Sequence, residues 1–286
     1  MKVNSKFKVS VASAALACTL SLAAGNAALA NGSFGDCVLT GEKGAHKIEP
    51  AVAGQFTVQI NLPAVGQFNG DTPETIKDGY EFCLAANIAN RLGLDTMKLV
   101  NVAFDAIVAG QTKDYDIALA QVSVTEPRKK VVDFSTPYVS SDFGIASQAK
   151  NPVTETSIKE GKVGVQAGTT VVEFAQETLK PASVDVFPDT SSLFTALAAG
   201  RVDAVITDTS IVLGQVANSN GRLAIVGQYA TGQDIAGVYP KGSANGEVID
   251  KIIAELKTDG TLDKLQEMYL VPEWGMSPAA VPFWKP

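Results

Sequence analysis

The arginine at position 128 stands at a point of a helix where a positive charge is unfavourable. It belongs to the run DIALAQVSVTEPRKKVVDFSTPY, residues 116–138, in which an apolar strand is followed by a Thr-Glu-Pro-Arg helix start. With Thr125 as the N-cap, Arg128 falls in the first helical turn, where the helix dipole disfavours a cation by ~0.3–1 kcal/mol. Free backbone N–H groups and a forked guanidinium both donate hydrogen bonds to a carboxylate. The sequence therefore predicts that Arg128 binds an anionic ligand group.

Two polar residues, Gln121 and Ser123, lie at the end of the preceding apolar strand, residues 117–124. Side chains of a strand alternate between its faces, so these two are expected on one face and the neighbouring valines on the other. In open α/β sheets, ligands bind beyond the carboxyl ends of the strands. The alternative is local: Ser123 would cap a turn and Gln121 would bond to a neighbouring loop. The strand alone does not decide between them.

Further candidates come from the second half of the chain. Gly168, Thr169 and Thr170 stand between a strand and a helix, where glycine permits close approach and hydroxyls lie beside free N–H groups. Asp208 likewise stands between a strand and a helix. For both places the alternative is ordinary helix capping. A cleft bounded by Arg128 and Asp208 would suit a zwitterion, with its carboxylate on the guanidinium and its ammonium on the aspartate.

Strands and helices alternate in two successive series, which predicts two α/β units in tandem. The first series has strands at 56–60, 97–102 and 117–124 and helices at 80–92 and 104–109. The second has strands at 162–166, 184–187, 202–206 and 223–227 and helices at 171–179, 192–200 and 211–217. Helices at 246–257 and 261–269 follow. A proline-containing tail after them is expected to be non-helical and to pack through Trp274, Phe283 and Trp284.

The first 30 residues have the pattern of a secretion signal. Three lysines precede an apolar run at 9–24, and Ala-Leu-Ala ends at Ala30, the expected cleavage position. The run is short for a membrane anchor, and a lipoprotein signal would have to use Cys18. Cleavage would leave 20 basic and 30 acidic residues, so nucleic acid is not an expected partner. We expect a periplasmic protein.

Cleavage would also leave two cysteines, Cys37 and Cys83, in an oxidising compartment. An even pair there favours a disulfide that ties the N-terminal extension to the first helix, although two separate buried thiols remain the alternative. With one histidine, His46, the mature chain offers no recognisable metal-ligand cluster. We expect His46 to be solvated, and we expect neither a metal nor a cofactor.

Two runs resemble the substrate-binding proteins of ABC importers for amino acids, within the two-lobed type II periplasmic binding proteins. One is VSVTEPRKKVVDFSTPY, similar to the family's S-x-T-x-x-R…DFS-x-PY run, and the other is TALAAGRVDAVITD. The resemblance implies two α/β lobes joined by two crossover strands, near 139–145 and 228–236, with the ligand between them. It also implies that Arg128, Ser123, Thr169 and Thr170 hold an α-carboxylate and that Asp208 holds an α-ammonium.

The sequence departs from the family in the expected side-chain pocket. Asn61 stands where an acidic residue is common, and Ala64 where an aromatic residue would fall. Phe68 or Phe104 could supply a stacking wall instead. For Phe104 the register is open by one residue, because an ungapped match to the family places Ala103 at the position in question. Asn61 and Gln121 together favour a ligand with a polar or small side chain.

The expected function is capture of an amino acid and its delivery to an ABC permease in the inner membrane by a monomeric protein. Alternatives are a sensory ligand-binding protein and an exported enzyme on the same scaffold, similar to a cyclohexadienyl dehydratase. Such an enzyme would need an acid or base in the cleft, and Glu126 is one candidate. The chain has no GxSxG or HExxH run, which favours a non-enzyme. The expected organisation is a signal peptide at 1–30, an extension at 31–50, lobe 1 at 51–140 plus 234–286, and lobe 2 at 141–233.

Overall fold

A single mixed sheet of nine strands organises the protein in the computed structural model, which describes residues 34–286. The expected signal peptide lies outside the described residues. The strand order is β2-β1-β3-β9-β5-β8-β6-β7, and β4 pairs with β9. The strands are β1 (Gln55–Ile60), β2 (Thr96–Asn101), β3 (Ile117–Ser123), β4 (Val132–Phe134), β5 (Val139–Gln148), β6 (Lys162–Gln166), β7 (Ser183–Phe187), β8 (Ala204–Asp208) and β9 (Leu223–Pro240).

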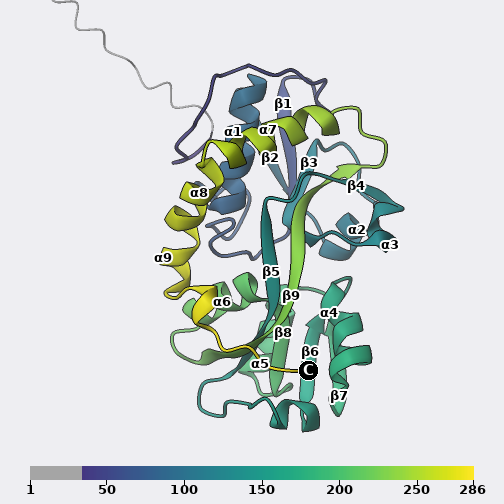
Figure 1. Ribbon diagram of the computed structural model, residues 1–286, viewed down its shortest axis with the longest axis vertical. Coiled ribbons are helices and arrows are strands. Elements are labelled where there is room, and N and C mark those ends of the chain that lie inside the picture. The colour runs from purple at the N-terminus through teal and green to yellow at the C-terminus, as the bar shows by residue number, and fades with distance from the viewer. Residues whose placement is uncertain (1–33) are drawn as a thin grey trace, which may run out of the picture. The chain divides into compact units, whose positions relative to one another are not determined.

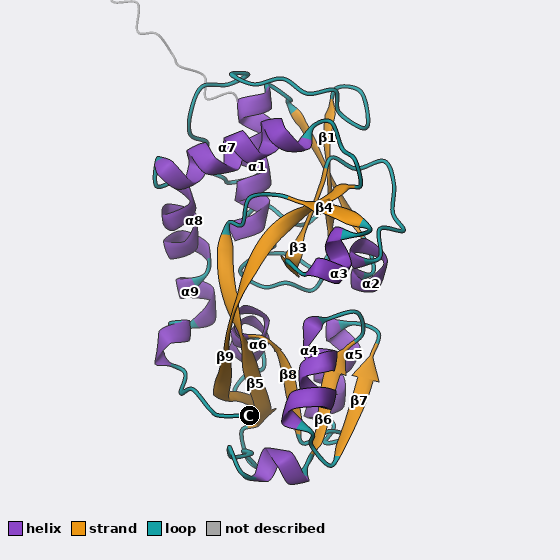
Figure 2. Cartoon of the chain, turned by 45° about the vertical axis from the view of Figure 1, so that its right-hand side comes forward, coloured by secondary structure: helices purple, strands orange, loops and turns teal. Residues whose placement is uncertain are grey.

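Helices accompany each part of this sheet (Figure 2). The α-helices are α1 (Tyr80–Leu92), α2 (Phe104–Val108), α3 (Glu126–Lys129), α4 (Thr170–Glu173), α5 (Thr190–Ala198), α6 (Thr209–Ala217), α7 (Gly246–Thr258), α8 (Thr261–Tyr269) and α9 (Val271–Trp274). Short 3-10 turns occur at Ser157–Glu160 and Pro278–Ala280, and a π-helical turn at Phe174–Leu179 continues α4.

Lobe 1 is built on β1, which pairs in parallel with β2 and β3. Strand β3 is buried along its whole length, as expected of an apolar strand inside a parallel sheet. Helix α1 contacts α7 and α8. The apolar face of β1 and the helices share one core, to which Phe56, Leu84, Ile88 and Ile252 belong, each with an exposed fraction of 0%. Burial of these side chains stabilises the lobe.

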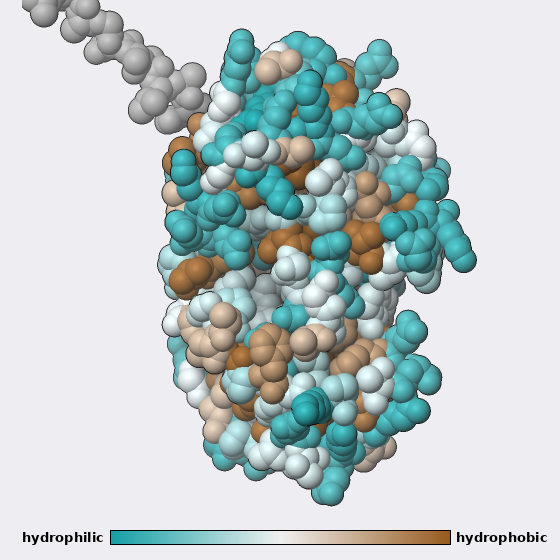
Figure 3. All heavy atoms as spheres, viewed as in Figure 1, coloured by the Kyte–Doolittle hydropathy of each residue, from teal (hydrophilic) through white to brown (hydrophobic). Residues whose placement is uncertain are grey.

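Lobe 2 repeats the scheme with β6 in parallel between β7 and β8. Its α-helices are α4, α5 and α6, and its core includes Phe143, Val165 and Ile206. Each lobe therefore has apolar core residues of its own. On the surface drawn in Figure 3, hydrophobic residues form separate patches around the middle, while hydrophilic residues cover much of the rest.

Strands β5 and β9 join the lobes and run side by side through the centre of the molecule (Figure 1). They pair antiparallel from Val139↔Ile235 to Gln148↔Leu223, with a register shift between Ser141 and Phe143. This is the two-lobed α/β fold with two crossover strands that the family resemblance implied. We propose that the lobes meet at 140/141 and 233/234, as expected from the sequence, because both positions lie close to the register shift between β5 and β9.

Several predicted elements differ from those observed. Helix α1 and helix α8 have the predicted bounds, but the predicted strand at 223–227 is the start of the 18-residue β9. The predicted helix at 171–179 consists of α4 and the π-helical turn. Asp208 is the last residue of β8, whereas the sequence placed it after the strand. Strand β4 was not predicted, because its three residues are too short to show a period.

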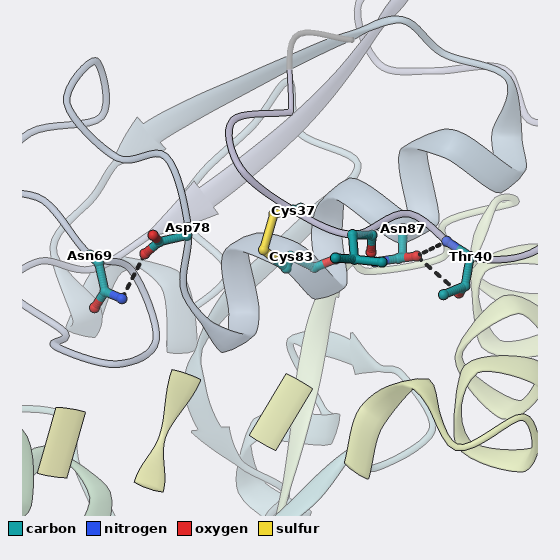
Figure 4. Close-up of a disulfide and its surroundings, with 7 residues drawn as sticks. Cys37, Thr40, Asn69, Asp78, Cys83 and Asn87 are labelled. Carbon is teal, nitrogen blue, oxygen red and sulfur yellow. Dashed lines mark hydrogen bonds between the residues drawn. A yellow bond between two sulfur atoms is a disulfide. The ribbon is translucent and has the colours of Figure 1, made fainter. Parts of the chain in front are cut away.

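The N-terminal extension is fastened to α1 (Figure 4). A disulfide joins Cys37 to Cys83, with their Cα atoms 5.3 Å apart, which confirms the predicted pairing. The backbone N–H of Thr40 donates to Oδ1 of Asn87 at 2.8 Å. The expectation that His46 is solvated was wrong, because its Nε2 lies 3.0 Å from Oε2 of Glu255 on α7. The extension is part of lobe 1's packing.

The C-terminal tail reaches lobe 2. It begins with helix α9, so the expectation of a non-helical tail was wrong at this point. Further on, the N–H of Gln228 on β9 donates to the carbonyl of Pro282 at 2.9 Å, and the N–H of Trp284 donates back to Gln228 at 2.8 Å. Phe283 is 56% exposed, so it contributes little to anchoring the tail. Between residues 34 and 286, none of the helices is both long and apolar enough to span a bilayer.

Candidate functional site

A cavity lies between the lobes at the carboxyl ends of β1, β3, β6 and β8. It is lined from lobe 1 by Asn61, Pro63, Ala64, Phe104, Ala120 and Gln121, and from lobe 2 by Gln166, Thr169, Thr190, Thr207, Asp208 and Ile211. Five of the predicted site residues therefore face one space: Asn61, Phe104, Gln121, Thr169 and Asp208. Strand ends from both lobes meet here, as expected for ligand sites of open α/β sheets.

Arg128 lies beside this cavity and bridges the lobes. Its Nη1 donates to the carbonyl of Ser123 at 2.7 Å, and its Nη2 donates across the lobes to the carbonyl of Gly168 at 2.8 Å. The guanidinium carbon lies 5.6 Å from the ring centroid of Phe104, within the range of a cation–π contact. Its backbone N–H donates to Oγ1 of Thr125 at 3.4 Å, which confirms the predicted N-cap.

Arg128 is a buried charge with little compensation. The residue is 8% exposed, and burial lowers the pKa of its guanidinium to about 10, while nearby Asp208 acts in the opposite direction. No ion pair joins Arg128 to a carboxylate anywhere in residues 34–286. Its two hydrogen bonds use two of the five donors of a guanidinium. The remaining donors suit an incoming carboxylate.

Asp208 presents the opposite charge from lobe 2. It precedes α6, but its side chain makes no capping hydrogen bond to that helix, so the capping alternative was wrong. Burial raises the pKa of its carboxyl to about 7, and the charge of Arg128 and a hydrogen bond with Ser141 limit the rise. Asp208 is half-buried, and a carboxylate that is partly withdrawn from solvent without an ion-pair partner favours a ligand ammonium.

The predicted anion cradle at 168–170 is only partly free for a ligand. Thr169 precedes α4 without capping it, and its hydroxyl donates to the carbonyl of Gln166 at 2.7 Å. The hydroxyl of Thr170 donates to Oε1 of Gln233 on β9 at 3.0 Å. Gly168 has φ 75°, and a Cβ there would lie 3.1 Å from the Cα of Asp105 in lobe 1. Glycine is therefore required by both its conformation and the close approach of the lobes.

The predicted alternation of β3 fails at Gln121. Its φ is 53°, in the left-handed region, and the pairing of β3 with β9 shifts register between Ala118 and Val122. The Gln121 side chain lines the cavity, and its Oε1 accepts hydrogen bonds from the hydroxyl of Ser210 in lobe 2 and from Nε2 of Gln67. Ser123 contributes its backbone carbonyl to Arg128, rather than its hydroxyl.

The two aromatic candidates have different positions. Phe104, the first residue of α2, lines the cavity beneath Arg128, while Ala103 is the N-cap of that helix. Phe68 is 1% exposed and packs in the core of lobe 1, and it is not among the residues that line the cavity. The amide of Asn61 donates to the carbonyl of Val102 at 2.9 Å, and that bond fixes its orientation at the cavity wall.

Three polar residues of the cavity were missed by sequence reasoning: Gln166, Thr190 and Thr207. The hydroxyl of Thr190 donates to Oε1 of Gln166 at 2.8 Å, so these two form a fixed polar pair. Gln166 ends β6, and Thr207 is the next-to-last residue of β8. Their position at the carboxyl ends of parallel strands was the available signal.

Comparison with known proteins supports the same fold. The L-cystine-binding protein TcyJ of Escherichia coli (strain K12) is 30% identical over 207 residues, which cover 71% of this chain and 77% of the relative. The structure of an ancestral arginine-binding protein bound to glutamine matches with a TM-score of 0.68 and 32% identity, covering 76% of this chain and 98% of that one.

A second solved structure is the amino acid ABC transporter substrate-binding protein AbpA from Streptococcus pneumoniae Canada MDR_19A, bound to L-arginine. It matches with a TM-score of 0.66 and 30% identity, covering 77% of this chain and 96% of that one. The model of the bacterial extracellular solute-binding proteins, family 3, matches residues 67–272. Because that match spans more than half of the chain, the chain belongs to the bacterial extracellular solute-binding proteins, family 3.

Proposed function

We propose that this protein captures an amino acid between its lobes by binding the α-carboxylate at Arg128 and the α-ammonium at Asp208. The observation that carries the proposal is the pair of opposite charges on different lobes, Arg128 buried and Asp208 half-buried, neither of which has an ionic partner among residues 34–286. Burial of a charge without a partner is costly, and a zwitterion would offset both costs at once. The relatives described above are amino-acid-binding proteins, which agrees with this assignment.

Ligand binding would favour the closed arrangement of the lobes. Beside the cavity, hydrogen bonds from Arg128 to Gly168 and from Ser210 to Gln121 already cross between them. A ligand that contacts both Arg128 and Asp208 reaches both walls only when the lobes are together, so it shifts the population toward closure. We propose that the closed monomer then delivers its ligand to an ABC permease, after export and signal-peptide cleavage at Ala30.

The cavity favours a neutral side chain that is small or polar. Among the described residues that line it, Asp208 is the only charged one, and the amides and hydroxyls of Asn61, Gln166, Thr190 and Thr207 form much of its wall. An acidic ligand side chain would find no cation there, and a large apolar one would leave these polar groups without partners. The ligand class we propose is therefore the neutral polar amino acids.

A thermal-shift series tests the proposal directly. The wild-type protein is heated with each of the twenty standard amino acids, with L-cystine, and with N-acetylated and carboxamide derivatives of the best binder. We expect neutral polar amino acids to raise the Tm, because a ligand that binds only the folded state stabilises it. We expect both derivatives to lose the effect. If no amino acid raised the Tm, amino-acid capture would be rejected.

The enzymatic alternative makes a different prediction. The relatives are transport binding proteins, and we propose that this chain likewise releases its ligand unchanged. After prolonged incubation with the protein, the bound amino acid should be recovered intact by mass spectrometry. Accumulation of a product would favour the exported enzyme.

A further inference from the structure

Glu81, the second residue of α1, is a buried carboxyl group that the proposed ligand contacts do not use. Its exposed fraction is 0%. Its Oε1 accepts hydrogen bonds from the backbone N–H of Gln121 at 3.0 Å and from the hydroxyl of Tyr138. Its Oε2 has no partner in the described part of the chain. A buried carboxyl oxygen without a hydrogen-bond partner lowers the stability of the fold. The presence of Glu81 here therefore calls for a role that an apolar residue could not fill.

The first partner of Glu81 is the strained residue of the site. Gln121 has φ 53°, a conformation that is uncommon for residues other than glycine and that persists only where the surroundings enforce it. The hydrogen bond from its backbone N–H to Glu81 helps to hold Gln121 in this conformation. In this conformation the side chain of Gln121 lines the cavity and accepts the hydrogen bond of Ser210 from lobe 2.

The second partner of Glu81 precedes a crossover strand. Tyr138 is buried and stands directly before Val139, the first residue of β5. Its carbonyl accepts a hydrogen bond from the hydroxyl of Tyr80 at 3.2 Å, so α1 holds this point of the chain twice. One carboxyl group thus links the cavity wall to the start of a strand that joins the lobes.

We propose that Glu81 is a positioning residue for ligand binding: its carboxylate holds the Gln121 backbone and the Tyr138 hydroxyl in the arrangement that closure requires. The inference rests on the proposed function, because ligand affinity is its readout. It assigns Glu81 no contact with the ligand. Without this carboxylate, Gln121 would relax toward an ordinary strand conformation, and its side chain would leave the position that meets Ser210.

The surroundings of Glu81 predict a pH effect as well. The titratable groups that act on it are Tyr138, Asp208 and Tyr80. Burial raises the pKa of Glu81 to about 7, the charge of Asp208 adds to the rise, and the hydrogen bonds from Tyr138 and Gln121 oppose it. Protonation below this pKa makes the carboxyl a weaker acceptor. Affinity should therefore fall as the pH drops through about 7.

Substitutions at Glu81 test the proposal by calorimetry at pH 8. The probe is L-glutamine. If another standard amino acid raises the wild-type Tm more than L-glutamine does, that amino acid is used instead. We expect Glu81→Ala to weaken binding by roughly 10-fold to 100-fold, the scale of a lost hydrogen bond to a charged group. Glu81→Gln should recover part of the loss, since its amide oxygen can still accept from Gln121. Glu247→Gln is the matched control, because Glu247 is the exposed second residue of the equally long α7.

A double-mutant cycle separates positioning from general structural damage. Glycine adopts φ > 0 without strain, so in the Gln121→Gly background the loss caused by Glu81→Gln should shrink severalfold. The pH dependence of affinity should also be shallower in Glu81→Gln than in wild type. The proposal would be overturned if the affinity of Glu81→Gln stayed within about twofold of the wild-type affinity. It would also be overturned if Glu81→Gln caused an equal loss of affinity in the wild-type and Gln121→Gly backgrounds. A wild type that binds no amino acid would instead refute the proposed function itself.

Discussion

Two buried arginines in lobe 1 differ in what surrounds their charge. Arg91, at the end of α1, has a side chain that is 5% exposed and forms ion pairs with Glu255 at 3.3 Å and with Asp259 at 2.5 Å. Arg128 is similarly buried, at 8% exposed, but its guanidinium donates only to the backbone carbonyls of Ser123 and Gly168.

The difference separates a structural charge from the charge that we propose binds the ligand. The partners of Arg91 belong to α7 and to the residue that follows that helix, so its charge is compensated within one lobe and fastens α1 there. Arg128 lacks such compensation in residues 34–286 and faces a carboxylate, Asp208, on the other lobe. Burial alone therefore does not mark a binding residue, whereas burial without an ionic partner does.

The largest expected effect is the loss of binding in Arg128→Ala. Removal of one partner of a buried charge pair costs on the order of 3–5 kcal/mol, so calorimetry should show amino-acid affinity reduced by at least a hundredfold. Arg91→Ala serves as the control, with affinity close to wild type. Near-equal affinities of wild type and Arg128→Ala would erase the distinction between the two arginines.

Asp208→Asn should separate function from stability. We expect affinity for free amino acids to drop by about 2–3 kcal/mol, as an ammonium loses its charged partner, whereas the already weak binding of an N-acetylated ligand should change little. The pKa of Asp208 is raised in the folded state from 3.8 to about 7, so the fold loses stability as the pH rises between these two values, and above them the ionised carboxylate carries the full cost. Asp208→Asn should then raise the unfolding free energy at pH 8 by on the order of 1 kcal/mol, measured by urea denaturation.

Arg91→Ala should show the opposite pattern, with lower stability and unchanged binding. The side chains of Glu255 and Asp259 are 38% and 42% exposed, so solvent screens the ion pairs and reduces their contribution. We expect a loss of about 2 kcal/mol in urea denaturation, part of it from lost packing of the arginine stem. A weakened affinity at full stability would count against a purely structural role.

The last expected effect is the pH dependence of wild-type binding. An ammonium binds the ionised form of Asp208, whose pKa is about 7, so binding at lower pH requires loss of a proton. Through Asp208 alone, affinity for a neutral amino acid should fall by up to about tenfold per pH unit between pH 7 and 5, and level off near pH 8. Calorimetry across this range checks it, and the profile of Asp208→Asn should be flatter. A flat wild-type profile would contradict the assigned role of Asp208.

Much of the site could be predicted from the sequence, because its charges stand out locally. Arg128 conflicts with the dipole of its own helix, and Asp208 stands between a predicted strand and a predicted helix, so both were visible without coordinates. Phe104 and Phe68 could not be separated in this way, since both are aromatic residues near strand ends. Which of them faces the cavity depends on the packing of lobe 1.

By itself, the sequence determined the two tandem α/β units, the bounds of α1 and α8, the Cys37–Cys83 pairing as the favoured option, and the identity of the two charges. Periodicity and capping are local signals, and short stretches of chain suffice to express them. Only the tertiary structure decided that Gln121 is left-handed, that Glu81 holds it, and that Gln166 and Thr207 complete the cavity. These features arise where strands distant in sequence meet, because hydrogen bonds across that junction can outweigh the local preference of a single residue.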